Sequence, residues 1–79
     1  MRNFPEYISR SMLVAAMDEW IIGDNAKRDK EILTYRILDG LTYEDTACEY
    51  QRNHPDRPLS ESQIKRIISK REQQLRKHL

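Results

Sequence analysis

The sequence predicts an all-α fold, a small domain of four helices. Apolar residues recur at steps of three and four residues in four separate segments, which is the pattern of helices with one buried face. No segment alternates between apolar and polar residues for long enough to form a strand. Both glycines and two of the three prolines lie between these segments, where the chain is expected to turn.

Length and composition fit a single domain that spans residues 1–79. Charged residues make up 34% and hydrophobic residues 38%, so the chain is expected to fold around a small core. No apolar run approaches the roughly 20 residues that cross a bilayer, and we expect no membrane segment. A single cysteine, Cys48, excludes an internal disulfide and favours a cytoplasmic location. We expect Cys48 to be a small buried residue.

The sequence holds no pattern typical of an enzyme or a metal site. One cysteine and two separated histidines, His54 and His78, do not make a set of metal ligands. Two glycines are too few for a glycine-rich phosphate loop, and no serine or cysteine stands at a spacing typical of a catalytic nucleophile. We therefore expect no catalytic activity, no metal and no other cofactor.

The first helix is expected from about Glu6 to Ile22, after a short arm that ends near Pro5. Residues 12–17 are apolar nearly all round, which predicts cover on more than one side of the helix. This segment is either a core helix or a surface that docks a second copy or a partner protein. Gly23 is expected to end the helix in a left-handed conformation. The residues expected at a partner or dimer surface are Met12, Met17, Trp20 and Ile21.

Two further helices are expected before the C-terminal segment. Asp24 or Asn25 can cap the second, which is expected to reach about residue 39 and to stop at Gly40. Thr42 can cap the third, which is expected to reach about residue 53. The stretch 54–58 then breaks the helix, because two prolines so close together cannot lie inside one.

The C-terminal segment carries the clearest functional pattern. Ser60 can cap a helix whose narrow inner stripe follows the helical period: Ile64, Ile67, Ile68, Arg71 and Leu75. Its other side bears groups that donate hydrogen bonds to phosphates or base edges: Ser62, Gln63, Lys65, Arg66, Ser69, Lys70, Gln73 and Lys77. Residues 60–79 hold six basic and two acidic residues, whereas residues 24–50 hold four basic and seven acidic residues. Such a helix either enters a DNA major groove or is simply a solvated face.

Three segments of the chain carry a resemblance to a known family. RDKEIL at 28–33, LDGLTYEDTA at 38–47 and LSESQIK at 59–65 together resemble region 4 of bacterial sigma factors, a helix-turn-helix that reads promoter DNA. The resemblance covers residues 28–79, and it implies that 42–50 lies across the DNA backbone while 60–79 is the recognition helix. Ala47 and Ser60 lie farther apart than in the family, so a longer turn or an altered crossing of the two helices is expected.

Together, these patterns predict a sequence-specific DNA-binding protein that regulates transcription or serves a mobile element. The expected partners are double-stranded DNA, RNA polymerase and a second copy of the chain bound through the first helix, which lies in residues 1–23. The alternative is a protein–protein adaptor of sigma-like shape that binds RNA polymerase or another regulator.

The residues expected to read bases are Glu61, Ser62, Gln63 and Arg66. Those expected at the DNA backbone are Thr42, Tyr43, Arg36, Ser60, Lys65, Ser69, Lys70, Arg71 and Lys77.

Overall fold

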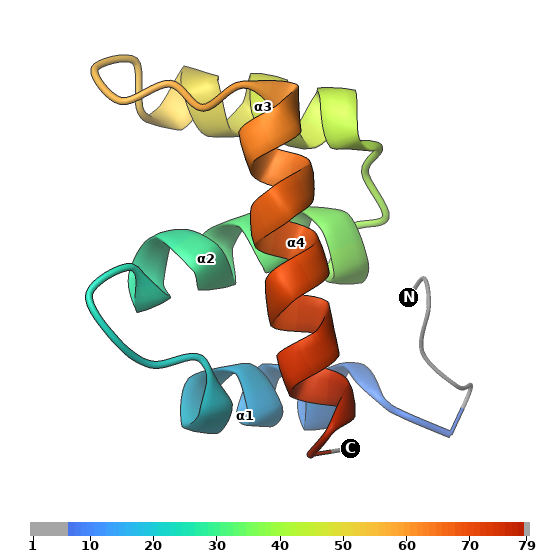
Figure 1. The fold of residues 1–79 in the computed structure, drawn as a ribbon. Coiled ribbons are helices and arrows are strands. Elements are labelled where there is room, and N and C mark those ends of the chain that lie inside the picture. The colour runs from blue at the N-terminus through green and yellow to red at the C-terminus, as the bar shows by residue number, and fades with distance from the viewer. Residues whose placement is uncertain (1–6, 79) are drawn as a thin grey trace.

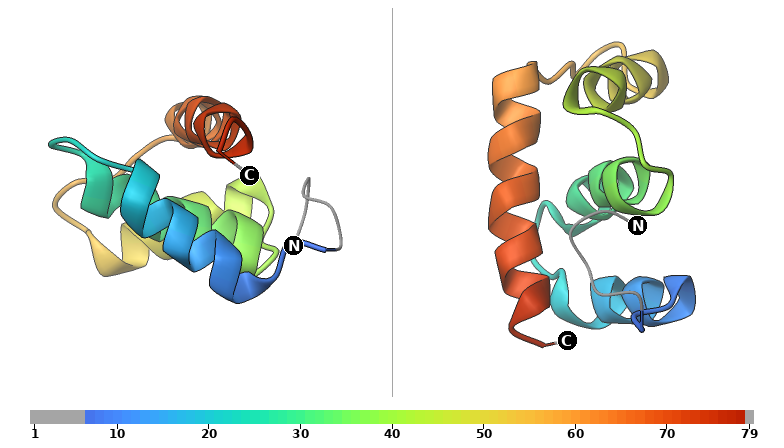
Figure 2. Two further views of the ribbon diagram at one scale, coloured as in Figure 1. Left: turned by 90° about the horizontal axis from the view of Figure 1, so that it is seen from below. Right: turned by 90° about the vertical axis from the view of Figure 1, so that its right-hand side faces the viewer.

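The computed structural model describes residues 7–78 and confirms the predicted all-α fold. Its four helices are α1 (Arg10–Trp20), α2 (Ala26–Leu33), α3 (Tyr43–Asn53) and α4 (Glu61–Arg76), and α2 continues into a π-helical turn, η1 (Thr34–Leu38). α1, α2 and α3 lie side by side in one layer, and α4 crosses the face of that layer (Figures 1 and 2). Residues 7–78 contain no strand.

The starts of α3 and α4 lie where the sequence predicts them, because each has a local side-chain cap. The Thr42 hydroxyl oxygen accepts a hydrogen bond from the Asp45 N–H at 3.0 Å. Ser60 and Gln63 form a capping box: the Ser60 Oγ accepts from the Gln63 N–H at 3.2 Å, and the Gln63 Oε1 accepts from the Ser60 N–H at 2.8 Å. Both predicted caps are therefore confirmed.

The first helix is shorter than predicted at both ends. α1 begins at Arg10 because Ser9 caps it, its Oγ accepting from the Met12 N–H at 3.1 Å. The expected arm and Pro5 lie outside the described residues. α1 ends at Trp20, where Ile21 turns to an extended backbone and buries its side chain. Gly23, with φ of 105°, belongs to the turn before α2 and does not end α1 directly.

The second helix widens in its last turns. The Thr34 hydroxyl donates to the Lys30 carbonyl at 2.8 Å, and the Asp39 N–H bonds back to the Thr34 carbonyl at 3.0 Å. A π turn holds one more residue than an α turn, so the side chains that follow rotate away from the α pattern. Arg36, which is expected at the DNA backbone, is thereby only 7% exposed. Gly40, with φ of 72°, ends the helix as predicted.

The core lies between α4 and the three-helix layer. Its fully buried apolar side chains come from α1, α2, η1 and α4 and from the segments beside α1: Ile8, Leu13, Ile21, Ile32, Leu33, Ile37, Ile64, Ile68 and Leu75. α3 contributes Thr46 and Tyr50, which are 0% and 4% exposed. Met17 and Ile21 are 4% and 1% exposed, so their expected place on a partner surface is wrong. Cys48 is exposed, contrary to expectation, because α3 turns Thr46 and Tyr50 inward and Cys48 lies between them on the outer face.

Candidate nucleic-acid interface

α4 stands out from the three-helix layer as a ridge along its whole length (Figure 2). Its inner side is fixed by Ile64, Ile68 and Leu75, which are all fully buried. The exposed residues on the other side, which we call the α4 ridge, are Glu61, Ser62, Gln63, Lys65, Arg66, Ser69, Lys70, Gln73, Arg76 and Lys77. The polar flank predicted from the sequence is therefore turned to solvent.

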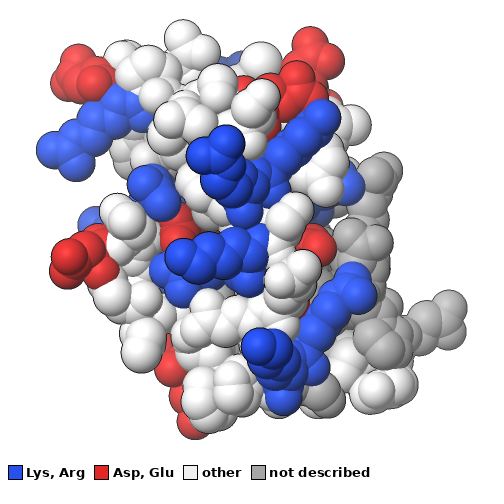
Figure 3. All heavy atoms as spheres, viewed as in Figure 1, with Lys and Arg blue, Asp and Glu red and all other residues white. Residues whose placement is uncertain are grey.

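Basic side chains gather on the face that carries the α4 ridge. Figure 3 shows lysines and arginines along α4, with aspartates and glutamates mostly toward the margins of that face. The exposed cations of the ridge are Lys65, Arg66, Lys70, Arg76 and Lys77. This distribution matches the charge asymmetry of the sequence and would present a positive face to a polyanion.

Lys65 keeps an accessible charge at the start of the ridge. Its Nζ lies 3.8 Å from the Glu61 Oε1, and the two side chains are 54% and 52% exposed. A pair this exposed contributes little free energy, so a phosphate can compete for the ammonium group. Glu61, expected to read bases, is thus on the ridge but beside a lysine of opposite charge.

Three predicted DNA-contacting residues from three different elements meet at one tyrosine ring. The Arg36 Cζ lies 4.2 Å from the Tyr43 ring centroid, and the Lys65 Nζ lies 5.5 Å from it, both within cation–π range. The Arg36 Nη1 also donates to the Leu41 carbonyl at 2.8 Å. Because Arg36 is buried, it supports Tyr43 from within the fold, and its expected contact with the DNA backbone is wrong.

Arg71 is also turned inward, contrary to the role expected for it at the DNA backbone. Its Nε donates to the Asp29 Oδ2 at 2.7 Å, and the two side chains are 12% and 5% exposed. Its Nη1 donates to the Gln74 Oε1 at 2.8 Å, and its Nη2 to the Ile22 carbonyl at 3.4 Å. Arg71 shares the inner side of α4 with the buried isoleucines, so it joins α4 to the layer.

The capping box changes what Gln63 can do. Its Oε1 accepts the Ser60 N–H, so the carbonyl end of the amide points back to the start of α4. Bidentate pairing with adenine needs both ends of a glutamine amide directed at the base. Ser60 and Gln63 therefore hold the helix start, whereas the exposed residues Ser62 and Arg66 remain directed outward.

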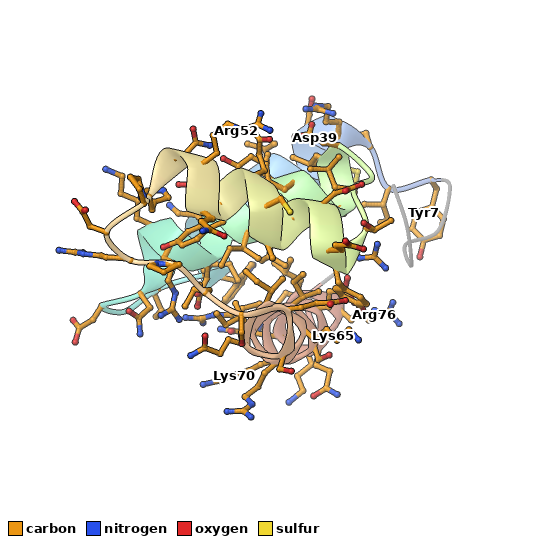
Figure 4. The ribbon with its side chains drawn as sticks, turned by 90° about the horizontal axis from the view of Figure 1, so that it is seen from above. Tyr7, Asp39, Arg52, Lys65, Lys70 and Arg76 are labelled. Carbon is orange, nitrogen blue, oxygen red and sulfur yellow. The ribbon has the colours of Figure 1, made fainter. Side chains whose placement is uncertain are left out.

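α3 adds no row of cations beside α4. Its first turn carries Glu44 and Asp45, both exposed, and Thr42 is occupied as the helix cap. Arg52 points away from α4, on the opposite side of α3 from Lys65 and Lys70 (Figure 4), and it pairs with Glu49 at 3.2 Å. The positive face is thus largely a property of α4.

Contacts with α2, η1 and α3 hold the start of the predicted long turn between α3 and α4. The His54 Nε2 lies 2.9 Å from both carboxylate oxygens of Glu31, and the His54 ring stacks on Tyr50 with centroids 4.4 Å apart. The Glu31 Oε2 also accepts from the Tyr35 hydroxyl at 2.9 Å, and that hydroxyl accepts from the Asn53 amide at 2.8 Å. The end of α3 is therefore fastened to α2 and η1.

This network also affects the titration of Tyr35. Burial raises the pKa of Tyr35 above its ordinary value of 10.0, and the hydrogen bond to the Glu31 carboxylate raises it further. Both effects disfavour the phenolate. Tyr35 therefore belongs to the structural support of the turn.

The end of α4 is tied to the end of α1. The Gln74 Nε2 donates to the Trp20 carbonyl at 2.8 Å, and the His78 ring stacks on the Trp20 ring with centroids 3.6 Å apart. Trp20 is half-buried, so of the four residues expected at a partner surface only Met12 is exposed, at 45%. The structure exposes three further apolar side chains in and beside α1, which are Tyr7, Val14 and Ile22.

A hollow lies away from the ridge, between the start of α2 and the turn that follows α3. It has a volume of about 550 Å³, and its charged lining residues are of both signs: Asp24, Lys27, Arg28, Glu31 and Arg57. Within residues 7–78, no group of three or more histidine, cysteine, aspartate or glutamate side chains is arranged to hold a metal ion. Among the helices of the same residues, none combines the length and apolar character that crossing a bilayer requires.

Comparisons with models of protein families, with curated proteins and with solved structures find no match to this chain. Its function is therefore inferred from its own residues and geometry.

Proposed function

We propose that this protein binds double-stranded DNA by laying α4 in the major groove, as a small regulator of transcription or a mobile-element protein. The observation that carries the proposal is the α4 ridge: a capped, continuous helix whose polar and basic side points to solvent along its length. A major groove about 12 Å wide admits one α-helix. A merely solvated helix also turns its polar side to water, so the excess of cations on that side, five basic residues against Glu61, is what favours a polyanion.

The resemblance to region 4 of sigma factors supports the same proposal. It places a positioning helix at 42–50 and a recognition helix from residue 60, and α3 and α4 begin at the caps Thr42 and Ser60. α3 and α4 also contact each other. In the proposed complex α4 is the recognition helix, and α3 lies across the DNA backbone.

The roles within α4 follow from exposure. Ser62 and Arg66 face outward and are suited to base edges, whereas Lys65, Lys70 and Lys77 are suited to phosphates. The limited surface of one such domain favours binding as a dimer or together with RNA polymerase.

The proposal is tested by measuring affinity for mixed-sequence duplex DNA at low and at physiological salt. We expect affinity to fall steeply with salt, because lysines that neutralise phosphates release counterions from DNA. Lys70→Ala should weaken binding to all sequences and reduce the slope of log affinity against log salt by about one. Arg52→Ala removes the same charge on the far side of α3 and should change neither quantity. Absence of duplex binding at low salt would overturn the proposal.

The second candidate function is a protein–protein adaptor that binds RNA polymerase or another regulator. It is favoured by the apolar side chains exposed around α1, with Met12, Val14 and Ile22 at 45%, 40% and 67%. If duplex binding is absent and Ile22→Glu or Met12→Glu abolishes capture of purified polymerase, the adaptor function replaces DNA binding.

A further inference from the structure

The outermost line of the α4 ridge runs along the whole helix. Successive residues of an α-helix are about 100° apart, so the line opposite the buried Ile64, Ile68 and Leu75 can be assigned from the period. Four residues at steps of four, three and four follow this line to within about 60°: Ser62, Arg66, Ser69 and Gln73. All four are exposed, and we call this line the crest.

Cations lie on both sides of the crest. The same period places Lys65 and Arg76 about 80–100° from that line on one side, whereas Lys70 and Lys77 lie about 20–40° from it on the other side. Figure 4, seen along α4, shows Lys65 and Arg76 on one side of the helix and Lys70 on the other. A major groove has base edges along its floor and a phosphate backbone at each wall, so this order of side chains matches the groove from wall to wall.

We propose that base pairs are read by the crest along its full length and that Gln73 is a specificity-determining residue. This inference rests on the proposed DNA binding by α4. Ser69 then belongs to the base-reading line, although the sequence pattern places it at the backbone. Lys65 and Arg76 hold one strand of the duplex, and Lys70 and Lys77 hold the other.

The two glutamines of the ridge differ in how their amides are held. The Gln63 amide is bound to the Ser60 N–H in the capping box. Within residues 7–78, no side-chain hydrogen bond holds the Gln73 amide, and Gln73 borders a shallow hollow of about 300 Å³ with Ser69, Glu72 and Arg76. Gln73 can therefore direct both its oxygen and its nitrogen at one base, the arrangement that pairs with adenine.

The length of the crest sets the length of the site. From Ser62 to Gln73 the helix rises about 16 Å at about 1.5 Å per residue. Base pairs are stacked about 3.4 Å apart, so the crest spans about five base pairs. Arg66 and Gln73 are separated by two helical turns, about 10 Å, and should act on positions about three base pairs apart.

The experiment is a selection of bound sequences from randomised duplex DNA, made with the full chain and three variants. Gln73→Ala should relax the preference at one end of the selected motif, lowering discrimination there roughly five- to a hundredfold. Arg66→Ala should relax a position about three base pairs inward from that end. Gln51→Ala removes an exposed glutamine of α3 outside the ridge and should leave the motif unchanged. Circular dichroism and the thermal midpoint of each variant should equal those of the wild type, since all three side chains are exposed.

The remaining outcomes separate the proposed DNA binding by α4 from the inference that the whole crest reads bases. If Arg66→Ala relaxes the motif and Gln73→Ala does not, reading stops in the first turns and the inference is overturned while DNA binding stands. The same conclusion follows if the wild type binds duplex DNA without selecting any motif. If the wild type binds no duplex at low salt, the proposed function itself is overturned.

Discussion

The Nε of Arg71 donates to the Oδ2 of Asp29 over 2.7 Å, and this buried ion pair ties α4 to α2. The second oxygen of the same carboxylate accepts from the Arg28 Nε at 2.9 Å. Arg71 also reaches the Ile22 carbonyl beyond α1, so one side chain connects three parts of the fold. The direction in which the α4 ridge faces therefore depends on a charge pair that solvent hardly touches.

Asp29→Asn should lower the free energy of unfolding by about 3 kcal/mol, because it leaves the buried Arg71 guanidinium without a charged partner. Asp18→Asn is the matched control, since Asp18 pairs with Lys30 at 3.5 Å while its side chain is 68% exposed. That change should cost less than about 0.5 kcal/mol. Urea unfolding followed by circular dichroism measures both values. Equal losses in the two variants would show that the Arg71–Asp29 pair does not hold α4.

Ser60→Ala should destabilise the protein by about 1 kcal/mol, because the Gln63 N–H loses its acceptor at the start of α4. Ser62→Ala, two residues later, removes a hydroxyl that makes no capping bond and should change stability by a few tenths of a kcal/mol at most. Thermal unfolding of the two variants under the same conditions gives the comparison. A loss as large for Ser62→Ala as for Ser60→Ala would contradict the capping role.

The helix starts at Thr42 and Ser60 could be predicted because the cap hydroxyl and the backbone N–H that donates to it lie within three residues of each other. The outward side of α4 could be predicted for the same reason, since a period of 3.6 residues separates its buried and polar sides locally. The partner of Arg71 could not be predicted, because Asp29 lies 42 residues away and nothing in the sequence marks it as buried.

Two other features depend on geometry that the residue pattern does not contain. The apolar run at 12–17 gives no sign of which side is covered, and the fold buries Met17 while it leaves Met12 exposed. The π turn that brings Arg36 inward depends on one widened turn after Leu33, whereas the sequence there is compatible with an uninterrupted α-helix. The helix-turn-helix assignment stays a prediction, because the described helices support the proposed contacts without testing them.

Tyr35 should make stability depend on pH in the alkaline range. Its pKa is raised in the folded state above the ordinary 10.0, so its contribution to stability is complete below pH 10 and is lost as pH rises through the folded pKa. Tyr35→Phe removes the hydroxyl between Glu31 and Asn53 and should cost about 1 kcal/mol at pH 7.

The difference in unfolding free energy between the wild type and Tyr35→Phe should therefore narrow as pH rises above 10. Urea unfolding at pH 8, 9, 10 and 11 measures this difference, and titration of lysines and of the other tyrosines cancels between the two proteins. Tyr7→Phe is the control, because Tyr7 is 74% exposed, and its difference from the wild type should stay near zero at every pH. A wild-type advantage over Tyr35→Phe that grows with pH would contradict the raised pKa.

Because His78 stacks on Trp20, tryptophan fluorescence can report whether the C-terminal end of α4 contacts the end of α1. The two rings lie 3.6 Å apart and within 2° of parallel, and Trp20 is the one tryptophan of the chain. His78→Ala should uncover the indole ring and shift its fluorescence emission to longer wavelength, while unfolding free energy falls by about 0.5–1 kcal/mol.

Lys77→Ala changes the neighbouring exposed residue and should leave the emission maximum where it is in the wild type. Gln74 still donates to the Trp20 carbonyl in His78→Ala, so helix content should be unchanged and the shift should report the lost stack alone. An emission maximum that is identical in His78→Ala and the wild type would mean that His78 does not cover Trp20 in solution.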